Sequence, residues 1–147
     1  MYSNYFNPFN YEFYRQPNNS QLTKDIQKAI NGEYSAILCY EKLAKKAPTQ
    51  AEKNTIIEIQ NDEKRHLDEF RKIYTNLTGK QASLKVIEEC PDLYKDGLVA
   101  AFKDEQETVD FYLDISDKST DIYTKEIFRR AAADEQNHAV WFLYFSK

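Results

Sequence analysis

The sequence predicts an all-α protein, a four-helix bundle of two antiparallel hairpins joined by a long crossover. In four stretches of the chain, apolar residues recur at alternating spacings of three and four, as in helices that bury one face in a bundle. Only 3 Gly and 4 Pro occur among the 147 residues, so little interrupts these helices. The motif D-E-x-x-H occurs twice, 72 residues apart, at 62–66 and 134–138, which indicates two related halves.

The first helix is expected to begin near Ser20, a good N-cap residue, and to end before Pro48. Residues 1–19 combine aromatic side chains with asparagines and have no sustained helical or strand period. They form either a poorly ordered tail or an arm that packs its rings on the bundle or on a neighbouring subunit. The bundle itself is expected to span 20–147. The inward residues of its first helix are Leu22, Ile26, Ala29, Glu33, Ala36, Tyr40 and Leu43.

The second helix is expected to follow after a short turn. Thr49 and Glu52 form a capping-box pattern at its start, and Gly79 is suited to end it. A short turn makes the first two helices antiparallel neighbours. The inward residues of the second helix are Ile56, Ile59, Glu63, His66, Phe70, Ile73 and Leu77.

A segment of roughly 79–95 then connects the two hairpins. At about 3.3 Å per extended residue it can cross the full length of a bundle, so the helix order is up-down-down-up. Within it, 83–89 is a candidate short helix. The fourth helix is expected to begin near Ser119 or Thr120. The inward residues are Leu98, Ala101, Glu105, Thr108, Tyr112 and Ile115 on the third helix, and Thr124, Phe128, Ala131, Glu135, His138, Phe142 and Phe145 on the fourth.

The inward stripes of all four helices contain charged or ionisable residues where a bundle normally holds leucine. Each D-E-x-x-H motif places a glutamate and a histidine three residues apart on one helical face, and another glutamate lies 30 residues earlier. Four buried carboxylates would repel one another and lose hydration unless two divalent cations balanced their charge. Glu107 faces away from the stripe and is not expected to take part. The predicted metal ligands are Glu33, Glu63, His66, Glu105, Glu135 and His138.

Four further residues are expected to support these ligands. Asp62 and Asp134 each lie four residues before a histidine of the same helix, and each is expected to accept the second ring N–H of that histidine. Their alternative role is that of ordinary solvated helix residues. Tyr40 and Tyr112 are expected to hydrogen-bond to a ligand carboxylate or to an oxygen species at the metals, and their alternative role is core packing.

Composition limits the classes of partner. The formal net charge of -4 argues against binding to nucleic-acid phosphates. No apolar run approaches the roughly 18 residues of a membrane span, and no signal sequence is evident, so a cytoplasmic protein without a membrane partner is expected. Cys39 and Cys90 form no C-x-x-C pair, which excludes a recognisable rubredoxin-type or zinc-ribbon module. Both are expected to be reduced thiols, and no motif supports a redox role for Cys39.

The pattern E…E-x-x-H…E…E-x-x-H on four helices resembles the signature of the ferritin-like di-iron superfamily. Within that superfamily, residues 33–41 and the first D-E-x-x-H motif are most similar to the ferritin-like domain of rubrerythrins, and the resemblance covers about 20–146. It implies two iron ions, with manganese or zinc as possible substitutes. Rubrerythrins tend to carry a further glutamate three residues after the ligand of the third helix, where this chain has Thr108.

The resemblance implies a di-iron oxidoreductase in which ferrous iron reacts with hydrogen peroxide or oxygen, as in peroxide reduction or ferroxidase activity. Because the usual rubredoxin domain is absent, it also implies a separate electron donor protein. The alternatives are a protein that binds, stores or delivers iron without turnover, and a helical module with a structural metal. The chain ends nine residues after His138, which leaves no room for the C-terminal helix of ferritin cages, so a homodimer is expected.

Overall fold

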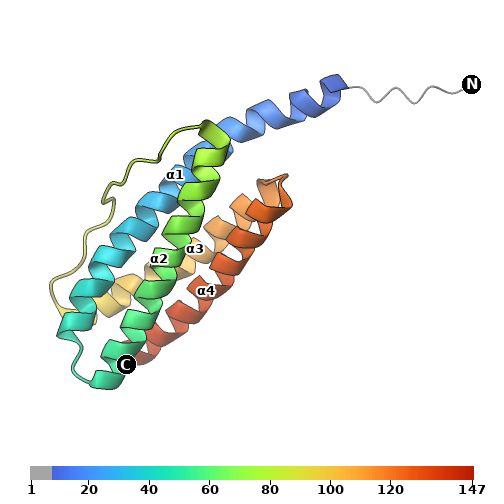
Figure 1. The fold of residues 1–147 in the computed structure, drawn as a ribbon. Coiled ribbons are helices and arrows are strands. Elements are labelled where there is room, and N and C mark those ends of the chain that lie inside the picture. Colours follow the sequence, from blue (N-terminus) through green and yellow to red (C-terminus); the bar gives the residue numbers. More distant parts are fainter. Residues whose placement is uncertain (1–7) are drawn as a thin grey trace, which may run out of the picture.

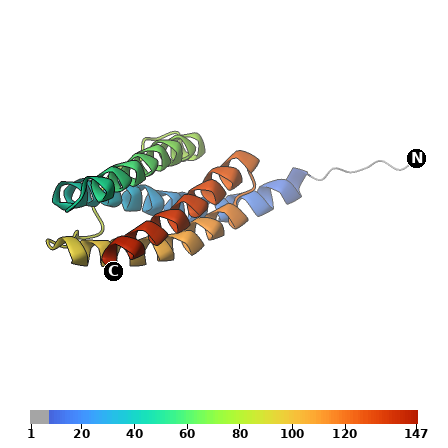
Figure 2. The same ribbon diagram turned by 90° about the horizontal axis from the view of Figure 1, so that it is seen from below.

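The computed structural model describes residues 8–147, and their side chains from residue 20 onward. These residues form four helices and no strand: α1 (Pro8–Lys46), α2 (Gln50–Thr78), α3 (Tyr94–Lys118) and α4 (Ile122–Ser146). Short turns join α1 to α2 and α3 to α4, and a long crossover connects the two hairpins (Figure 1). Figure 2 shows the two hairpins as two layers packed against each other. The predicted all-α four-helix bundle is confirmed.

Helix α1 is longer at its N-terminal end than the sequence predicted. It begins at Pro8, so Ser20 lies inside the helix and the prediction of an N-cap there is wrong. Serine is common at helix starts but is also tolerated in helix interiors, so its presence does not require a helix to begin there. The first part of α1 projects beyond the other helices (Figure 1). The question of a tail or an arm concerns 1–7, which lie outside the described residues, and side chains of 8–19, which are not described either.

Helix α2 has both predicted caps. The Thr49 hydroxyl accepts a hydrogen bond from the Glu52 N–H at 3.1 Å. At the other end, Gly79 has φ 71°, and its N–H donates to the Thr75 carbonyl. Glycine adopts this left-handed conformation without the steric cost of a Cβ atom, which explains why the helix stops there.

The start of α4 lies slightly later than predicted. Ser119 is the C-cap of α3, since its N–H donates to the carbonyls of Ile115 and Ser116. Asp121 is the N-cap of α4, and its carboxylate accepts from the Thr124 N–H at 3.0 Å. The charged carboxylate of aspartate binds free N–H groups more strongly than a neutral hydroxyl does. Asp121 directly follows Thr120, so the helix begins near the position expected.

The crossover, 79–93, contains no helix, so the short helix expected over 83–89 is absent. The segment instead runs beside α1 (Figure 1). Polar side chains of α1 form hydrogen bonds with three of its backbone groups. An extended segment bonded in this way has no need of internal helical hydrogen bonds. The bonds are Gln27 Nε2 to the Ser83 carbonyl at 2.9 Å, the Lys85 N–H to Asn31 Oδ1 at 3.1 Å, and the Ile87 N–H to Ser35 Oγ at 3.0 Å.

The same path brings the two cysteines together. Cys39 and Cys90 form a disulfide, with Cα atoms 5.3 Å apart and a sequence separation of 51. The expectation of two reduced thiols is therefore wrong, because it treated residues far apart in sequence as far apart in space. Closing a loop of this length limits the unfolded chain and contributes about 4 kcal/mol in the chain-entropy model.

The apolar core consists of two clusters at different heights in the bundle. One is built around stacked Phe70 and Phe128, whose ring centroids lie 4.2 Å apart. The other contains Leu43, Ile56 and Phe142. The inward residues predicted for α1 are all buried, whereas Leu77, in the last turn of α2, is 37% exposed.

No helix of the described residues is long and apolar enough to span a bilayer.

Candidate metal centre

The six predicted ligands meet between the two apolar clusters. None of these residues is more than 2% exposed. Their donor atoms form two groups, in each of which all atoms lie within 4.8 Å of one another. The first group is Glu33, Glu63, His66 and Glu135, and the second is Glu63, Glu105, Glu135 and His138.

The two groups share the glutamates of the D-E-x-x-H motifs, Glu63 and Glu135. Glu33 belongs to the first group alone and Glu105 to the second alone. Each group thus offers a metal ion one histidine, one carboxylate of its own and two carboxylates that also belong to the other group.

Both histidines turn the same ring nitrogen to the carboxylates. His138 Nδ1 lies 2.8 Å from Glu63 Oε1 and 3.5 Å from Glu105 Oε2. His66 Nδ1 lies 3.1 Å from Glu135 Oε1 and 3.4 Å from Glu33 Oε1. Nδ1 is therefore the nitrogen available to a metal, and Nε2 is available to a supporting group.

The donor atoms have no adequate partner within the protein. Across the described part of the chain, six buried side-chain atoms lack a hydrogen bond, and each of the six predicted ligands supplies one. Unpaired buried polar atoms are costly in free energy. A partner that stabilises these atoms must bind both carboxylate oxygens and neutral imidazole nitrogens. Divalent cations do so. The atoms are Glu33 Oε2, Glu63 Oε1, His66 Nδ1, Glu105 Oε2, Glu135 Oε1 and His138 Nδ1.

Burial and mutual repulsion set the charges of the metal-free site. Burial, followed by the charges of nearby glutamates, raises the pKa of Glu63 and of Glu135 well above the usual value. For His66, burial alone would lower the pKa, but the Glu33 charge and the Asp134 hydrogen bond raise it to about 10. Without a metal, the site therefore holds protons where cations would bind, so metal binding must displace them.

The aspartates support the histidines across the two hairpins. Asp134 Oδ2 lies 2.9 Å from His66 Nε2, and Asp62 Oδ2 lies 2.9 Å from His138 Nε2. The expectation that each aspartate serves the histidine of its own helix is wrong. A residue four positions earlier on a helix shares a face with the histidine, but the outward ring nitrogen points across to the neighbouring helix.

Arg65, which the sequence analysis did not single out, joins the two aspartates. Its guanidinium lies 3.0 Å from Asp62 Oδ1 and 2.7 Å from Asp134 Oδ2. The contact with Asp62 has i,i+3 spacing, a signal that the sequence offered. The contact with Asp134 depends on the packing of α2 against α4.

The tyrosines also reach across the hairpins. The Tyr40 hydroxyl of α1 donates to Glu105 of α3, and the Tyr112 hydroxyl of α3 donates to Glu33 of α1. Burial raises the pKa of both phenols well above the usual value, so both remain donors. Each tyrosine thus fixes one oxygen of a glutamate and leaves the other oxygen free for a metal.

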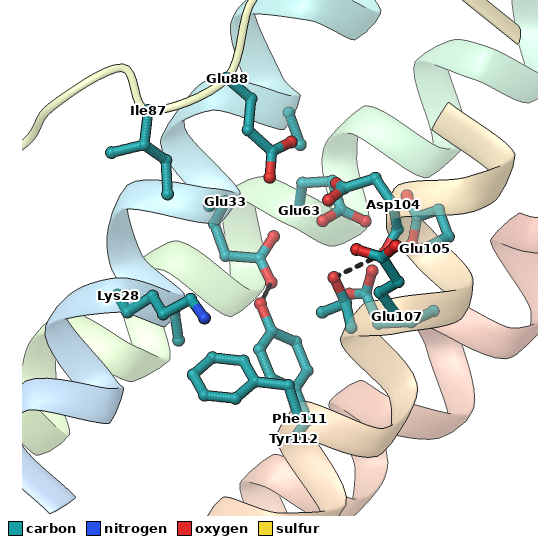
Figure 3. Close-up of a pocket in the computed structure, with 15 residues that line it drawn as sticks. Lys28, Glu33, Glu63, Ile87, Glu88, Asp104, Glu105, Glu107, Phe111 and Tyr112 are labelled. Carbon is teal, nitrogen blue, oxygen red and sulfur yellow. Dashed lines mark hydrogen bonds between the residues drawn. The ribbon is translucent and has the colours of Figure 1, made fainter. Parts of the chain in front are cut away.

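A cavity of about 140 Å³ opens onto the centre between α1, α3 and the crossover. Figure 3 shows Glu88 reaching from the crossover towards Glu33 and Asp104. Burial and the Glu88 charge raise the pKa of Asp104 to about 8. Neither Glu88 nor Asp104 was predicted as a site residue. Glu88 lies in a segment without periodicity, so no sequence pattern indicated its position. Thr108 also lines this cavity, and its hydroxyl donates to the Asp104 carbonyl at 2.8 Å.

Comparison with known proteins agrees with this geometry. A family description of rubrerythrins matches residues 24–93. An uncharacterized protein of Bacillus subtilis, YhjR, is 56% identical over 124 residues, which cover 84% of this chain and 86% of YhjR. The chain belongs to the same family as YhjR and carries a rubrerythrin-type domain.

Two solved structures are similar to this rubrerythrin-type fold. A hypothetical protein from Pyrococcus furiosus has a TM-score of 0.75 at 25% identity, over 85% of this chain and 87% of that one. A ferritin-like, diiron-carboxylate protein from Bacillus anthracis has a TM-score of 0.74 at 21% identity, over 88% of this chain and 98% of that one. The second likeness concerns the fold alone.

Proposed function

We propose that this rubrerythrin-type protein is a di-iron oxidoreductase in which two ferrous ions react with hydrogen peroxide or oxygen. The observation that carries the proposal is the set of six unpaired buried donor atoms, one on each predicted ligand. Carboxylates with neutral imidazole suit iron, and manganese or zinc are accepted by similar donor sets. When bound, two ferrous ions supply the two electrons that reduce the O–O bond.

The residues around the donors prepare the site for such a reaction. Tyr40 and Tyr112 hold the two unshared glutamates, while Asp62 and Asp134 hold the histidine rings. These contacts fix the donor atoms before an ion arrives and raise the basicity of the imidazoles. The cavity beside Glu33 gives a small oxidant a way in. The electron donor is proposed to be separate from this domain.

Anaerobic titration with ferrous iron, followed by a pulse of peroxide, tests the proposal. About two irons per chain, oxidised rapidly by a stoichiometric amount of peroxide, are expected. Diferrous protein that neither peroxide nor oxygen oxidises would contradict the proposal. Binding of many more irons, with little consumption of peroxide, would instead indicate storage or delivery.

Glu105→Gln and Glu107→Gln form a matched pair for this titration. Both residues lie on α3 and line the cavity, but only Glu105 belongs to a donor group. Glu105→Gln is expected to lose one iron per chain and the rapid oxidation, because one ion loses its unshared carboxylate. Glu107→Gln is expected to behave as the unmodified protein.

A further inference from the structure

The disulfide between Cys39 and Cys90 lies between the protein surface and the metal centre. On its outer side is a groove lined by both cysteines and by Leu38, Lys42 and Pro91. On its inner side is a cavity of about 40 Å³, lined by Cys39 and Tyr40. The pair is thus accessible from outside and adjacent to the interior.

The inner cavity leads towards the donor atoms. It shares Ala36, Glu88 and Asp104 with the larger cavity that opens onto the centre. Cys39 directly precedes Tyr40 in the chain, and the Tyr40 hydroxyl donates to Glu105. Along α1, Cys39 lies six residues beyond Glu33, about 9 Å at 1.5 Å per residue. A short covalent and hydrogen-bonded path therefore connects the sulfur atoms to one predicted ligand.

We propose that Cys39 and Cys90 are a redox-active pair that takes two electrons from an external thiol and passes them to the metal centre. This inference rests on the proposed function, which requires an electron donor. It makes an additional iron–sulfur domain unnecessary, because the donor becomes a dithiol protein or small thiol that enters the surface groove.

The proposed chemistry balances in two steps. An external thiolate attacks one sulfur and breaks the disulfide, forming a mixed disulfide, and a second external thiol then releases both cysteines as thiols. The two thiols next lose two electrons and two protons and re-form their S–S bond. The electrons convert two ferric ions to two ferrous ions, and the protons leave to solvent.

A purely structural role is the competing interpretation, since the disulfide also ties the crossover to α1. The crossover, however, already has three hydrogen bonds with α1 side chains: Gln27 donates one, and Asn31 and Ser35 each accept one. Its path along α1 therefore has support that does not depend on the disulfide. A structural disulfide should resist external thiols in the folded protein, whereas a redox pair should exchange with them.

The first measurement uses the metal-free, folded chain in buffers of reduced and oxidised dithiothreitol. Both cysteines are expected to interconvert as one two-electron couple without loss of the helical circular dichroism signal. A disulfide that is reduced only when the chain unfolds would overturn the proposal.

The second measurement counts thiols and ferrous iron in a single turnover. Protein with reduced cysteines is loaded with ferrous iron under argon, oxidised with one equivalent of peroxide, and sampled over time. Two thiols should disappear for each pair of ferric ions that returns to ferrous. The same pulse given to zinc-loaded protein measures direct oxidation of the thiols, which should be at least tenfold slower.

Variants separate this inference from the proposed function. In Cys39→Ser, in Cys90→Ser and in the double variant, the return of ferrous iron on adding dithiothreitol should slow at least tenfold, with iron content as the control for folding. Ferric protein that keeps both thiols, or equal thiol loss with zinc, would overturn the relay and leave the peroxide reaction standing. Diferrous protein that neither peroxide nor oxygen oxidises would overturn the proposed function and the relay together.

Discussion

Replacing Asp134 with asparagine tests how the two hairpins are coupled at the metal centre. Asp134 Oδ2 lies 2.9 Å from His66 Nε2 on the other hairpin, while His138, on its own helix, pairs with Asp62. The substitution keeps the size of the side chain but removes the negative charge that orients the His66 ring. Partners of this kind contribute about 10- to 100-fold in metal affinity, or about 1.4–2.7 kcal/mol.

The assay measures Zn²⁺ affinity in two backgrounds that each leave one histidine. In the His138→Ala background, Asp134→Asn should weaken binding by about 10- to 100-fold, because the remaining ion depends on His66. In the His66→Ala background the same change should have little effect. Asp62→Asn is the matched control and should show the opposite pattern.

The result that would refute this reasoning is a loss of affinity mainly in the His66→Ala background. Asp134 would then act on His138, four residues along its own helix, as the sequence spacing alone suggests. Arg65 also contacts Asp134, at 2.7 Å, so Arg65→Gln serves as a further control. Its effect should be smaller, because the contact between Asp134 and His66 remains.

Four further outcomes follow from the structure. Tyr112→Phe removes the hydroxyl that donates to Glu33, a buried carboxylate whose pKa is lowered. The free energy of unfolding in urea should therefore fall by about 1.5–3 kcal/mol. An unchanged midpoint of urea unfolding would contradict this prediction. Gly97→Ala places a Cβ atom 2.4 Å from Leu43 Cδ2. Overpacking of about 1–3 kcal/mol then outweighs a helix-propensity gain of about 1, so the melting temperature should fall rather than rise. Asp121→Ala removes an N-cap and should cost about 0.5–2 kcal/mol at pH 7. Hydrogen bonds from the first turn of α4 lower the pKa of Asp121, so this stability is present above the unfolded-state value of about 3.9 and is lost as pH falls through the folded-state pKa. The free energies of unfolding of Asp121→Ala and of the unmodified protein should therefore converge in strong acid. A difference that stays constant with pH would argue against the cap. Finally, Zn²⁺ binding should release protons and strengthen as pH rises. Burial raises the pKa of the two shared glutamates, and nearby carboxylates raise the pKa of both histidines despite their burial. Calorimetry in two buffers of different ionisation enthalpy measures the proton release, and no release should be seen if the site is already deprotonated.

The six donor positions could be found in the sequence because each depends on one helix at a time. Glu33 and Tyr40 lie on a stripe of period three to four, and that period alone decides which face of α1 is buried. The turns between helices are short, so the distances along the chain from Glu33 to Pro48 and from Pro48 to Glu63 also set the common height of the two glutamates. Local rules of this kind fixed the fold class and the level of the site.

The partners of those donors depend on how the hairpins pack, which the period does not determine. Asp62 shares a face with His66, and the spacing therefore suggested a bond within α2. The ring of His66 instead directs Nδ1 to the carboxylates, so Nε2 points at α4 and meets Asp134. The crossover is less predictable still. It has no period, and its position beside α1 decides the roles of Glu88 and Cys90.

The exchange of partners makes the duplicated motif one site rather than two. The ion position that contains Glu33 takes His66 from α2 and Glu135 from α4, and its supporting tyrosine, Tyr112, comes from α3. The other position repeats this use of all four helices with the roles of the hairpins reversed. Each hairpin supplies three of the four donors of one position, and the fourth donor, a shared glutamate, comes from the other hairpin. Packing of the two hairpins therefore completes both donor groups at once, because each hairpin contributes the shared glutamate that the other group needs.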